Sequence, residues 1–199
     1  MLSIKEKKEI EYSIRKSKFI GKIFPVYTKE EVEEILKKER EKYRDATHIC
    51  YAYILENTSK VSDDGEPSGT AGIPILNVLQ KNNLYFTLCM VIRYFGGIKL
   101  GAGGLIRAYG KGVKEVLSIS EIVFLKKGKK IKIEFDYNFV KKIDTLLKDA
   151  EIINKDFKEK ITYEIRIEDE LYQYIKVPLE KIVENTQIIE NIFIKENKS

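Results

Sequence analysis

Residues 84–118 read LYFTLCMVIRYFGGIKLGAGGLIRAYGKGVKEVLS, and three patterns follow one another in this stretch. Leu84–Phe95 is dense in β-branched and aromatic residues, which predicts a central strand. Gly96–Gly104 is rich in glycine and predicts a tight turn. Apolar residues then recur every three or four positions, which predicts a helix that ends near Ser118. A strand, a glycine-rich loop and a helix in this order indicate an α+β fold.

This stretch belongs to a longer segment that has no acidic residue. Between Pro67 and Lys114 the chain has nine of its 12 glycines and six cations, namely Lys81, Arg93, Lys99, Arg107, Lys111 and Lys114. The last three cations lie at steps of four and three, so they form a basic ridge on the predicted helix. A surface of this composition favours an anion as its partner.

Two glycine-rich loops in this segment lead into predicted helices. Gly101, Gly103 and Gly104 precede the helix described above, and Ser68–Thr70 precedes a second helix predicted over Gly72–Gln80. Such loops offer unpaired backbone amides and the positive end of a helix dipole, which bind phosphate. Glycines in loops also serve simply to allow tight turns and close packing. Two loops of this kind in one acid-free segment favour an anion site.

Three carboxylates, Asp63, Asp64 and Glu66, lie directly upstream of this segment. They are candidates to hold Mg²⁺ beside a phosphate or to supply a catalytic base. The alternative is that they build a turn and cap the next helix. His48 begins a predicted strand, His48–Leu55, where it is either a polar residue at the end of a sheet or a weaker catalytic candidate.

Missing motifs argue against several classes of enzyme. No G-x-S-x-G, H-E-x-x-H or G-x-x-x-x-G-K-[ST] pattern occurs, so we do not expect a conventional triad hydrolase, a zinc protease or a Walker-type nucleotide hydrolase. One histidine and two scattered cysteines do not supply the ligands of a transition-metal site. Apart from the Mg²⁺ considered above, the sequence predicts no cofactor.

Length and charge predict two small domains. The chain has 199 residues, of which 43% are hydrophobic. Residues 1–127 contain 22 Lys or Arg and 16 Asp or Glu, whereas residues 128–199 contain 14 and 15, so the basic excess belongs to the amino-terminal part. The charged segment Lys126–Lys130 is the predicted, flexible boundary.

The cysteines and the amino terminus predict a cytoplasmic protein. Cys50 and Cys89 each lie in an apolar run and form no Cys-x-x-Cys pair, which is typical of reduced, structural cysteines. The first 20 residues contain no continuous hydrophobic segment, so we expect no contact with a membrane.

Other elements follow from local patterns. The chain opens with a predicted hairpin over Ile10–Ile14 and Phe19–Val26, and Thr28 and Glu31 then form a capping box for a helix that runs to about Tyr43. Residues 128–199 show the order β-α-β-β-α-β, which is typical of a ferredoxin-like domain. Pro178 is expected to kink the second helix of that domain.

Residues 63–76, DDGEPSGTAGIPIL, and residues 93–109, RYFGGIKLGAGGLIRAY, closely resemble the signature of the YigZ/IMPACT family. Ser17–Ile20 and His48–Tyr53 are similar to two earlier motifs of that family. The resemblance implies that residues 1–127 form a β-sheet with helices on one face, like the second domain of certain small-subunit ribosomal proteins and domain IV of elongation factor G. It also implies that residues 128–199 are similar to domain V of that factor.

Such a tandem implies contact with RNA or the ribosome, and the eukaryotic relatives regulate translation. The leading hypothesis is therefore a cytoplasmic protein that binds nucleic acid or the ribosome and regulates translation. The residues predicted to bind the anion are Ser17, Lys18, Ser68, Gly69, Thr70, Arg93, Gly96, Gly97, Lys99, Gly101, Gly103, Gly104 and Arg107. Two alternatives stay open: a Mg²⁺-dependent enzyme acting on a small phosphorylated metabolite or nucleotide, and a protein-docking module whose partners are unknown.

Overall fold

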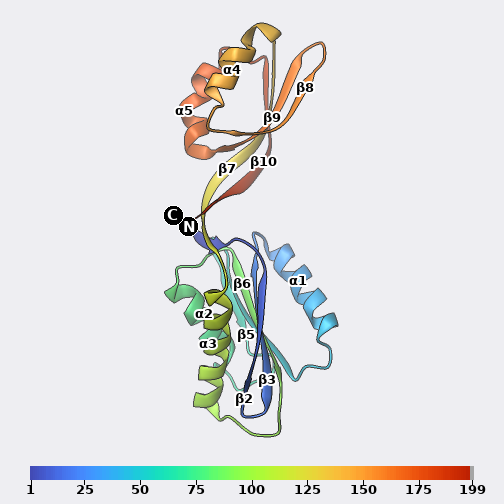
Figure 1. Ribbon diagram of the computed structural model, residues 1–199, viewed down its shortest axis with the longest axis vertical. Helices are drawn as coiled ribbons and strands as arrows, with labels where there is room; N and C mark the ends of the chain where they lie inside the picture. The colour runs from blue at the N-terminus through green and yellow to red at the C-terminus, as the bar shows by residue number, and fades with distance from the viewer. Residues whose placement is uncertain (198–199) are drawn as a thin grey trace. The chain divides into compact units, whose positions relative to one another are not determined.

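The computed structural model describes residues 1–197 and contains two compact units, Met1–Phe124 and Leu125–Glu196 (Figure 1). Each unit has its own cluster of buried hydrophobic residues. The predicted α+β class is confirmed: the amino-terminal unit is built on an antiparallel sheet with helices, and the carboxy-terminal sheet is consistent with a ferredoxin-like domain. Within the described residues, no helix is both long enough and apolar enough to span a membrane.

The amino-terminal sheet has the strand order β2-β3-β6-β4-β5, and all neighbouring strands are antiparallel. Its strands are β2 (Lys8–Ile14), β3 (Ser17–Pro25), β6 (Thr87–Tyr94), β4 (His48–Ile54) and β5 (Ser59–Ser62). Arg15 and Lys16 join β2 to β3 with φ angles of 45° and 67°, as a tight two-residue hairpin turn requires. The predicted opening hairpin is therefore confirmed.

Two short strands were not predicted from the sequence. β1 (Leu2–Ile4) precedes the opening hairpin and pairs with Ile122–Phe124 at the start of β7. β5 forms the edge of the amino-terminal sheet beside β4. Both strands are short, so neither shows a long enough alternation of apolar and polar residues to be recognised.

Helices cover both faces of the amino-terminal sheet. α2 (Gly72–Lys81) and α3 (Ala102–Ser118) pack on one face, and α1 (Lys29–Lys42) lies along the other (Figure 1). Gly21 of β3 shows this alternation, because a Cβ atom there would lie 2.9 Å from the carbonyl oxygen of Gly112 in α3. The next residue, Lys22, points to the opposite face, where it is fully buried and forms an ion pair with Glu39 of α1. The expectation of helices on one face thus holds for α2 and α3 but not for α1.

The carboxy-terminal unit contains β7 (Ile122–Phe135, from Leu125 onward), the 3-10 turn η1 (Tyr137–Phe139), α4 (Val140–Leu146), β8 (Glu151–Phe157), β9 (Ile161–Glu168), α5 (Asp169–Glu180) and β10 (Asn185–Asn197). Its strands lie in the order β10-β7-β9-β8. Pro178 lies inside α5, which continues to Glu180. The charged segment Lys126–Lys130 is part of β7 and not a flexible linker, because its backbone is held in strand pairing with β9 from Gly128 onward.

Candidate anion-binding site

One end of the amino-terminal sheet gathers residues that are far apart in the sequence. Ser17 begins β3, His48 begins β4, and Arg93 is the second-to-last residue of β6. Since β6 is antiparallel to both β3 and β4, its end lies beside their beginnings, and Arg93 is the register partner of both Phe19 and His48. The loops that lead to α2 and α3 reach the same end of the sheet, because Glu66 of the first loop contacts Arg93 and Gly96 of the second contacts Ser17.

A buried ion pair between Arg93 and Glu66 forms the centre of this end. Nη1 of Arg93 donates a hydrogen bond of 2.6 Å to Oε1 of Glu66, and the hydroxyl of Tyr109 donates one of 2.8 Å to the same oxygen. The guanidinium lies 5.5 Å from the ring centroid of Phe19 and 5.4 Å from that of Phe95. Only 4% of Arg93 is exposed. These contacts hold the pair in one geometry, since a buried charge needs both a partner and good packing.

This arrangement differs from the role predicted for these residues. Arg93 and Ser17 were predicted to contact a phosphate, and Glu66 to hold Mg²⁺ or act as a base. Instead, Nη2 of Arg93 lies 3.4 Å from the hydroxyl of the buried Ser17, and Glu66 neutralises the guanidinium. The reason is the alternation of β6, which directs Arg93 to the same face as Cys89 and Val91, beneath α3.

Asp63 closes the amino terminus of α2. Its Oδ2 accepts the N–H of Gly69 at 2.9 Å, and its Oδ1 accepts those of Ala71 at 3.0 Å and Gly72 at 2.8 Å. Burial alone would raise the pKa of Asp63, but these three amide donors outweigh that effect and hold the pKa below its ordinary value of 3.8. The Asp63 carboxylate therefore accepts the backbone N–H groups at the start of α2 that were predicted to bind a phosphate.

The rest of this loop is also engaged within the protein. The hydroxyl of Thr70 donates to the carbonyl of Pro67 at 2.6 Å, and Ser68 is exposed. Asp64 accepts the N–H of Ile49 at 2.6 Å and lies 3.7 Å from Arg40. The three carboxylates thus face three different sets of donors, and no group of three or more metal-binding side chains comes together among residues 1–197. The geometry matches the turn and cap that the sequence analysis gave as the alternative.

His48 and Cys50 line the same loop. Nδ1 of His48 lies 2.8 Å from the carbonyl oxygen of Asp64 and must carry the hydrogen, because a carbonyl only accepts. Its Nε2 lies 3.8 Å from Oε1 of Glu66, and 20% of the side chain is exposed. The thiol of Cys50 donates to the carbonyl of Asp63 at 3.0 Å, and burial raises the pKa of this thiol to about 12. Cys50 therefore stays protonated and structural.

The loop before α3 differs from the loop before α2, because no carboxylate closes the helix that follows it. Gly101 caps α3 without a side-chain hydrogen bond, and the first turn contains no acid. Gly97 and Gly101 have φ angles of 83° and 71°, and a Cβ atom at either would meet open space. The first amides of an α-helix have no partner within the helix, so the start of α3 stays a candidate to bind an anion.

Gly96 has a different role from these two glycines. A Cβ atom there would lie 2.0 Å from the carbonyl oxygen of Lys16, so only glycine lets the loop pack against the β2–β3 turn. This contact places Arg15 and Lys16, which are both exposed, beside the loop. Neither residue was predicted from the sequence, where the only signal was their position next to Ser17 and Lys18. Lys18 itself is exposed and lies 2.8 Å from Glu11.

A basic groove of about 530 Å³ runs between α2 and α3. It is lined by Pro74, Asn77, Val78, Lys81, Ile106, Arg107, Gly110, Lys111 and Lys114. Four of these residues are cations and none is an acid. Nη1 of Arg107 lies 3.6 Å from the position of a Cβ atom on Gly103, so the guanidinium reaches back to the amino terminus of α3. The groove and the uncapped helix end therefore form one basic surface.

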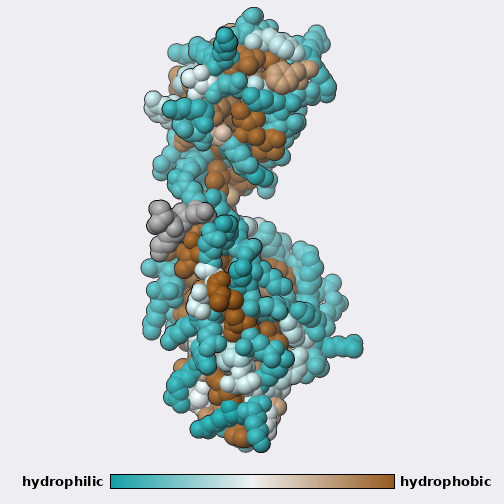
Figure 2. Space-filling view, in the orientation of Figure 1, coloured by the Kyte–Doolittle hydropathy of each residue, from teal (hydrophilic) through white to brown (hydrophobic). Residues whose placement is uncertain are grey.

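The charges of this groove are largely free within the described chain. Lys111 lies 3.2 Å from Glu115, but Lys81, Arg107 and Lys114 have no ion pair among residues 1–197. Lys99 in the preceding loop is exposed and has none either. The sequence predicted the ridge on α3, but it did not reveal that Lys81 of α2 forms the opposite wall. Figure 2 shows hydrophilic side chains over most of the visible face of this unit, interrupted by patches of hydrophobic ones.

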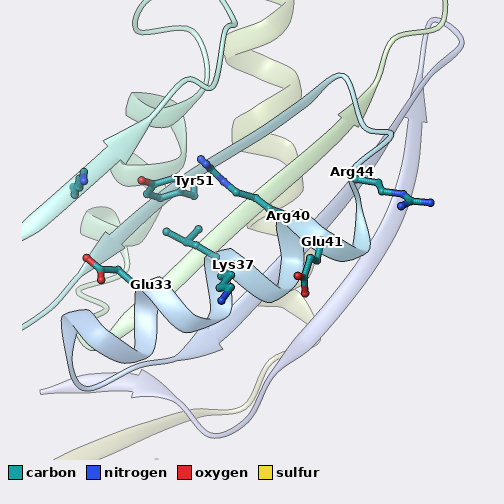
Figure 3. A pocket seen from close by; sticks show the side chains of 8 residues that line it. Glu33, Lys37, Arg40, Glu41, Arg44 and Tyr51 are labelled. Atoms are coloured by element: carbon teal, nitrogen blue, oxygen red, sulfur yellow. The ribbon is translucent and has the colours of Figure 1, made fainter.

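A second groove, of about 680 Å³, lies on the opposite face of the sheet between α1 and the strands β4 and β5 (Figure 3). Tyr51 and Lys60 come from the strands, Arg44 follows the end of α1, and α1 itself contributes Glu33, Leu36, Lys37, Arg40 and Glu41. Its charges are of both signs, and Arg40 already has Asp64 as a partner. No residue predicted to bind the anion lines it. A polyanion is therefore better matched to the groove between α2 and α3.

Comparisons with known proteins show which proteins this chain resembles in sequence and in fold. Residues 15–117 match a family model described as the Impact N-terminal domain. The chain is 42% identical over 172 residues to "IMPACT family member YvyE" of Bacillus subtilis, which covers 84% of this chain and 79% of that protein. It is 34% identical to "IMPACT family member YigZ" of Escherichia coli, over 73% of this chain and 74% of that protein. A solved structure titled "Crystal structure of an hypothetical protein" aligns with a TM-score of 0.62 and 27% identity, over 94% of this chain and 95% of that one.

Proposed function

The chain belongs to the IMPACT family, and from this premise we propose that it binds RNA or the ribosome through phosphate groups and regulates translation. The observation that best supports the proposal is the groove between α2 and α3, in which four cations come together without an acid. Lys99 and the uncapped start of α3 extend this basic surface. The regulatory role rests on the family resemblance, and the phosphate contacts rest on the surface.

Electrostatics explains why such a surface favours a polyanion. Each Lys or Arg that neutralises a phosphate releases a condensed counterion, so affinity falls with salt. Lys81, Lys99, Arg107 and Lys114 have no ion pair within the described chain, so no internal contact has to be broken when they bind a phosphate. Five contacts, counting Lys111, correspond to a slope of about −3.5 in a plot of log affinity against log salt for a single strand.

The test is a titration of fluorescein-labelled RNA and of purified ribosomes at several salt concentrations. We expect binding at low salt that weakens steeply as salt is added, and weaker binding by Lys99→Glu. Lys37→Glu is the matched control, because Lys37 is an exposed lysine in the groove on the opposite face of the sheet. Absence of binding at low salt, or equal effects of the two substitutions, would reject the proposal.

The enzyme alternative receives less support from the geometry. Asp63, Asp64 and Glu66 each have protein donors, so their oxygens do not converge on one point where Mg²⁺ and a phosphate would meet. Nε2 of His48 lies 3.8 Å from Oε1 of Glu66 and 20% of the His48 side chain is exposed, which fits acid–base chemistry. A thermal-shift screen of nucleotides with and without Mg²⁺ tests this alternative, because a ligand of the folded state raises the melting temperature.

A further inference from the structure

We infer that the groove between α2 and α3 takes a single strand of nucleic acid and not a duplex; this rests on the proposed function and specifies the form of its ligand. The inference starts from the cations on α3. Arg107, Lys111 and Lys114 form one row, and at a rise of about 1.5 Å per residue this row is about 10 Å long. Successive phosphates of an extended strand can lie along such a row, with Lys81 facing them from α2.

The floor of the groove is suited to unstacked bases. Ile106 is 46% exposed, and Pro74 and Val78 of the same lining are buried apolar residues of α2. Gly110 leaves room between the helices, since a Cβ atom there would meet nothing within 4 Å. The exposed Asn77 amide both donates and accepts hydrogen bonds, so it can meet the edge of any base. The apolar residues and Asn77 would contact the bases, while the cations of the groove contact the phosphates.

A duplex does not match this shape. α2 and α3 pack directly against each other, and packed helices lie about 8–10 Å apart, which leaves a narrow trough. A duplex keeps its bases stacked inside and would present only its outer phosphates to this trough. An acidic amphipathic protein helix is matched less well, because Ile106 is the only residue of this lining with more than 40% exposure that is apolar.

The decisive variant is Gly110→Leu, which fills the groove but leaves every charge in place. Gly110→Ala is the smaller substitution at the same position; both replace glycine by a better helix former, and circular dichroism is used to check that both variants fold. The probe is a labelled oligouridine of about twelve nucleotides, with an RNA duplex of equal length as the comparison. We expect Gly110→Leu to weaken binding of the single strand about tenfold or more, Gly110→Ala to weaken it by a smaller factor because it adds a single carbon atom, and the duplex to bind about tenfold more weakly than the single strand.

The outcomes separate this inference from the proposed function. If Arg107→Glu weakens RNA binding but Gly110→Leu does not, RNA is bound at the basic surface and the groove inference is overturned. Equal affinity for the duplex and the single strand overturns it as well. Displacement of the oligouridine by an acidic amphipathic peptide that binds more tightly assigns the groove to a protein partner and also overturns it. If no RNA binds to the parent protein, the proposed function and the inference fail together.

Discussion

Gly110 and Gly112 lie two residues apart in α3, yet their surroundings are opposite. A Cβ atom on Gly110 would meet open space, whereas one on Gly112 would lie 2.4 Å from the hydroxyl oxygen of Tyr12 and 3.1 Å from two of its ring carbons. The Tyr12 ring cannot easily move away, because it stacks on Phe19 and its hydroxyl donates to the carbonyl of Ala108 at 2.9 Å. A close approach of another side chain therefore explains glycine at position 112 but not at position 110.

Alanine substitutions at these glycines should therefore change stability in opposite directions. We expect Gly110→Ala to raise the free energy of unfolding by about 1 kcal/mol, the usual advantage of Ala over Gly inside a helix. Gly112→Ala gains the same propensity but displaces the Tyr12 ring, and we expect a net loss of about 1–2 kcal/mol. Urea unfolding of both variants measures this, and a shift of the same sign in both would contradict the packing described.

Asp63 is expected to make stability depend on pH. Its folded-state pKa lies below the ordinary value of 3.8, so its contribution to stability is complete above that value and is lost as the pH falls toward the folded-state pKa. Asp63→Asn removes the charge and one of the acceptors, and should lower the free energy of unfolding at pH 7 by about 1–3 kcal/mol. The difference between the two proteins should shrink as the pH falls below 3.8 toward the folded-state pKa, as measured by urea unfolding at each pH. A difference that stays constant would show that the charge is not the cause.

The buried pair of Arg93 and Glu66 is also testable. Glu66→Ala leaves an uncompensated guanidinium beneath α3, and we expect a loss of about 3–5 kcal/mol in the free energy of unfolding. Glu66→Gln keeps an oxygen for Arg93 and Tyr109 and should lose less. Thermal unfolding measures both variants. If both lose a similar small amount of stability, the ion pair contributes little to the stability of the fold.

At the scale of elements, the capping of α1 shows what local patterns can predict. Oγ1 of Thr28 accepts the N–H of Glu31 at 3.1 Å, as the sequence predicted. Oε2 of Glu31 accepts the N–H of Tyr27 at 2.6 Å, one residue earlier than the capping box specifies. Thr28→Ala should cost about 1 kcal/mol of stability, whereas Thr28→Ser should cost much less, because it keeps the hydroxyl. Equal melting temperatures for the two variants would contradict this.

Local sequence patterns were sufficient to predict most of the helices and strands, but they did not predict the contacts within the candidate site. The glycine-rich turn before α3, the capped α1 and the βαββαβ order depend on neighbours in the sequence, and the structure confirms them. The partners of Asp63 and Arg93 depend instead on how strands and loops meet in space. A carboxylate that caps a helix and a carboxylate that binds a metal have the same sequence signature. An arginine buried under a helix likewise cannot be told from an arginine on the surface. Lys81 joins the ridge of α3 only because α2 packs beside it.

At the scale of the whole molecule, charge is distributed unevenly between the two units. Met1–Phe124 contains 20 Lys or Arg and 16 Asp or Glu, a net charge of +4, whereas Leu125–Glu196 contains 15 of each and is neutral. A basic protein can attract nucleic acid simply through its overall charge, without any defined site. The two cases can be told apart by substitution. Binding at a local site depends on which cation is removed, whereas attraction by the overall charge depends only on how many cations are removed.

Two pairs of substitutions with the same change in net charge separate these cases. Arg107→Ala with Lys114→Ala removes two cations from the groove, and Lys141→Ala with Lys142→Ala removes two exposed cations at α4 of the other unit. In a plot of log affinity for oligouridine against log salt, the first pair should make the slope shallower by about 1.4, because two phosphate contacts are lost. The second pair should leave the slope unchanged. If both pairs lower the slope equally, the attraction belongs to the net charge of the protein, and the groove has no special part in it.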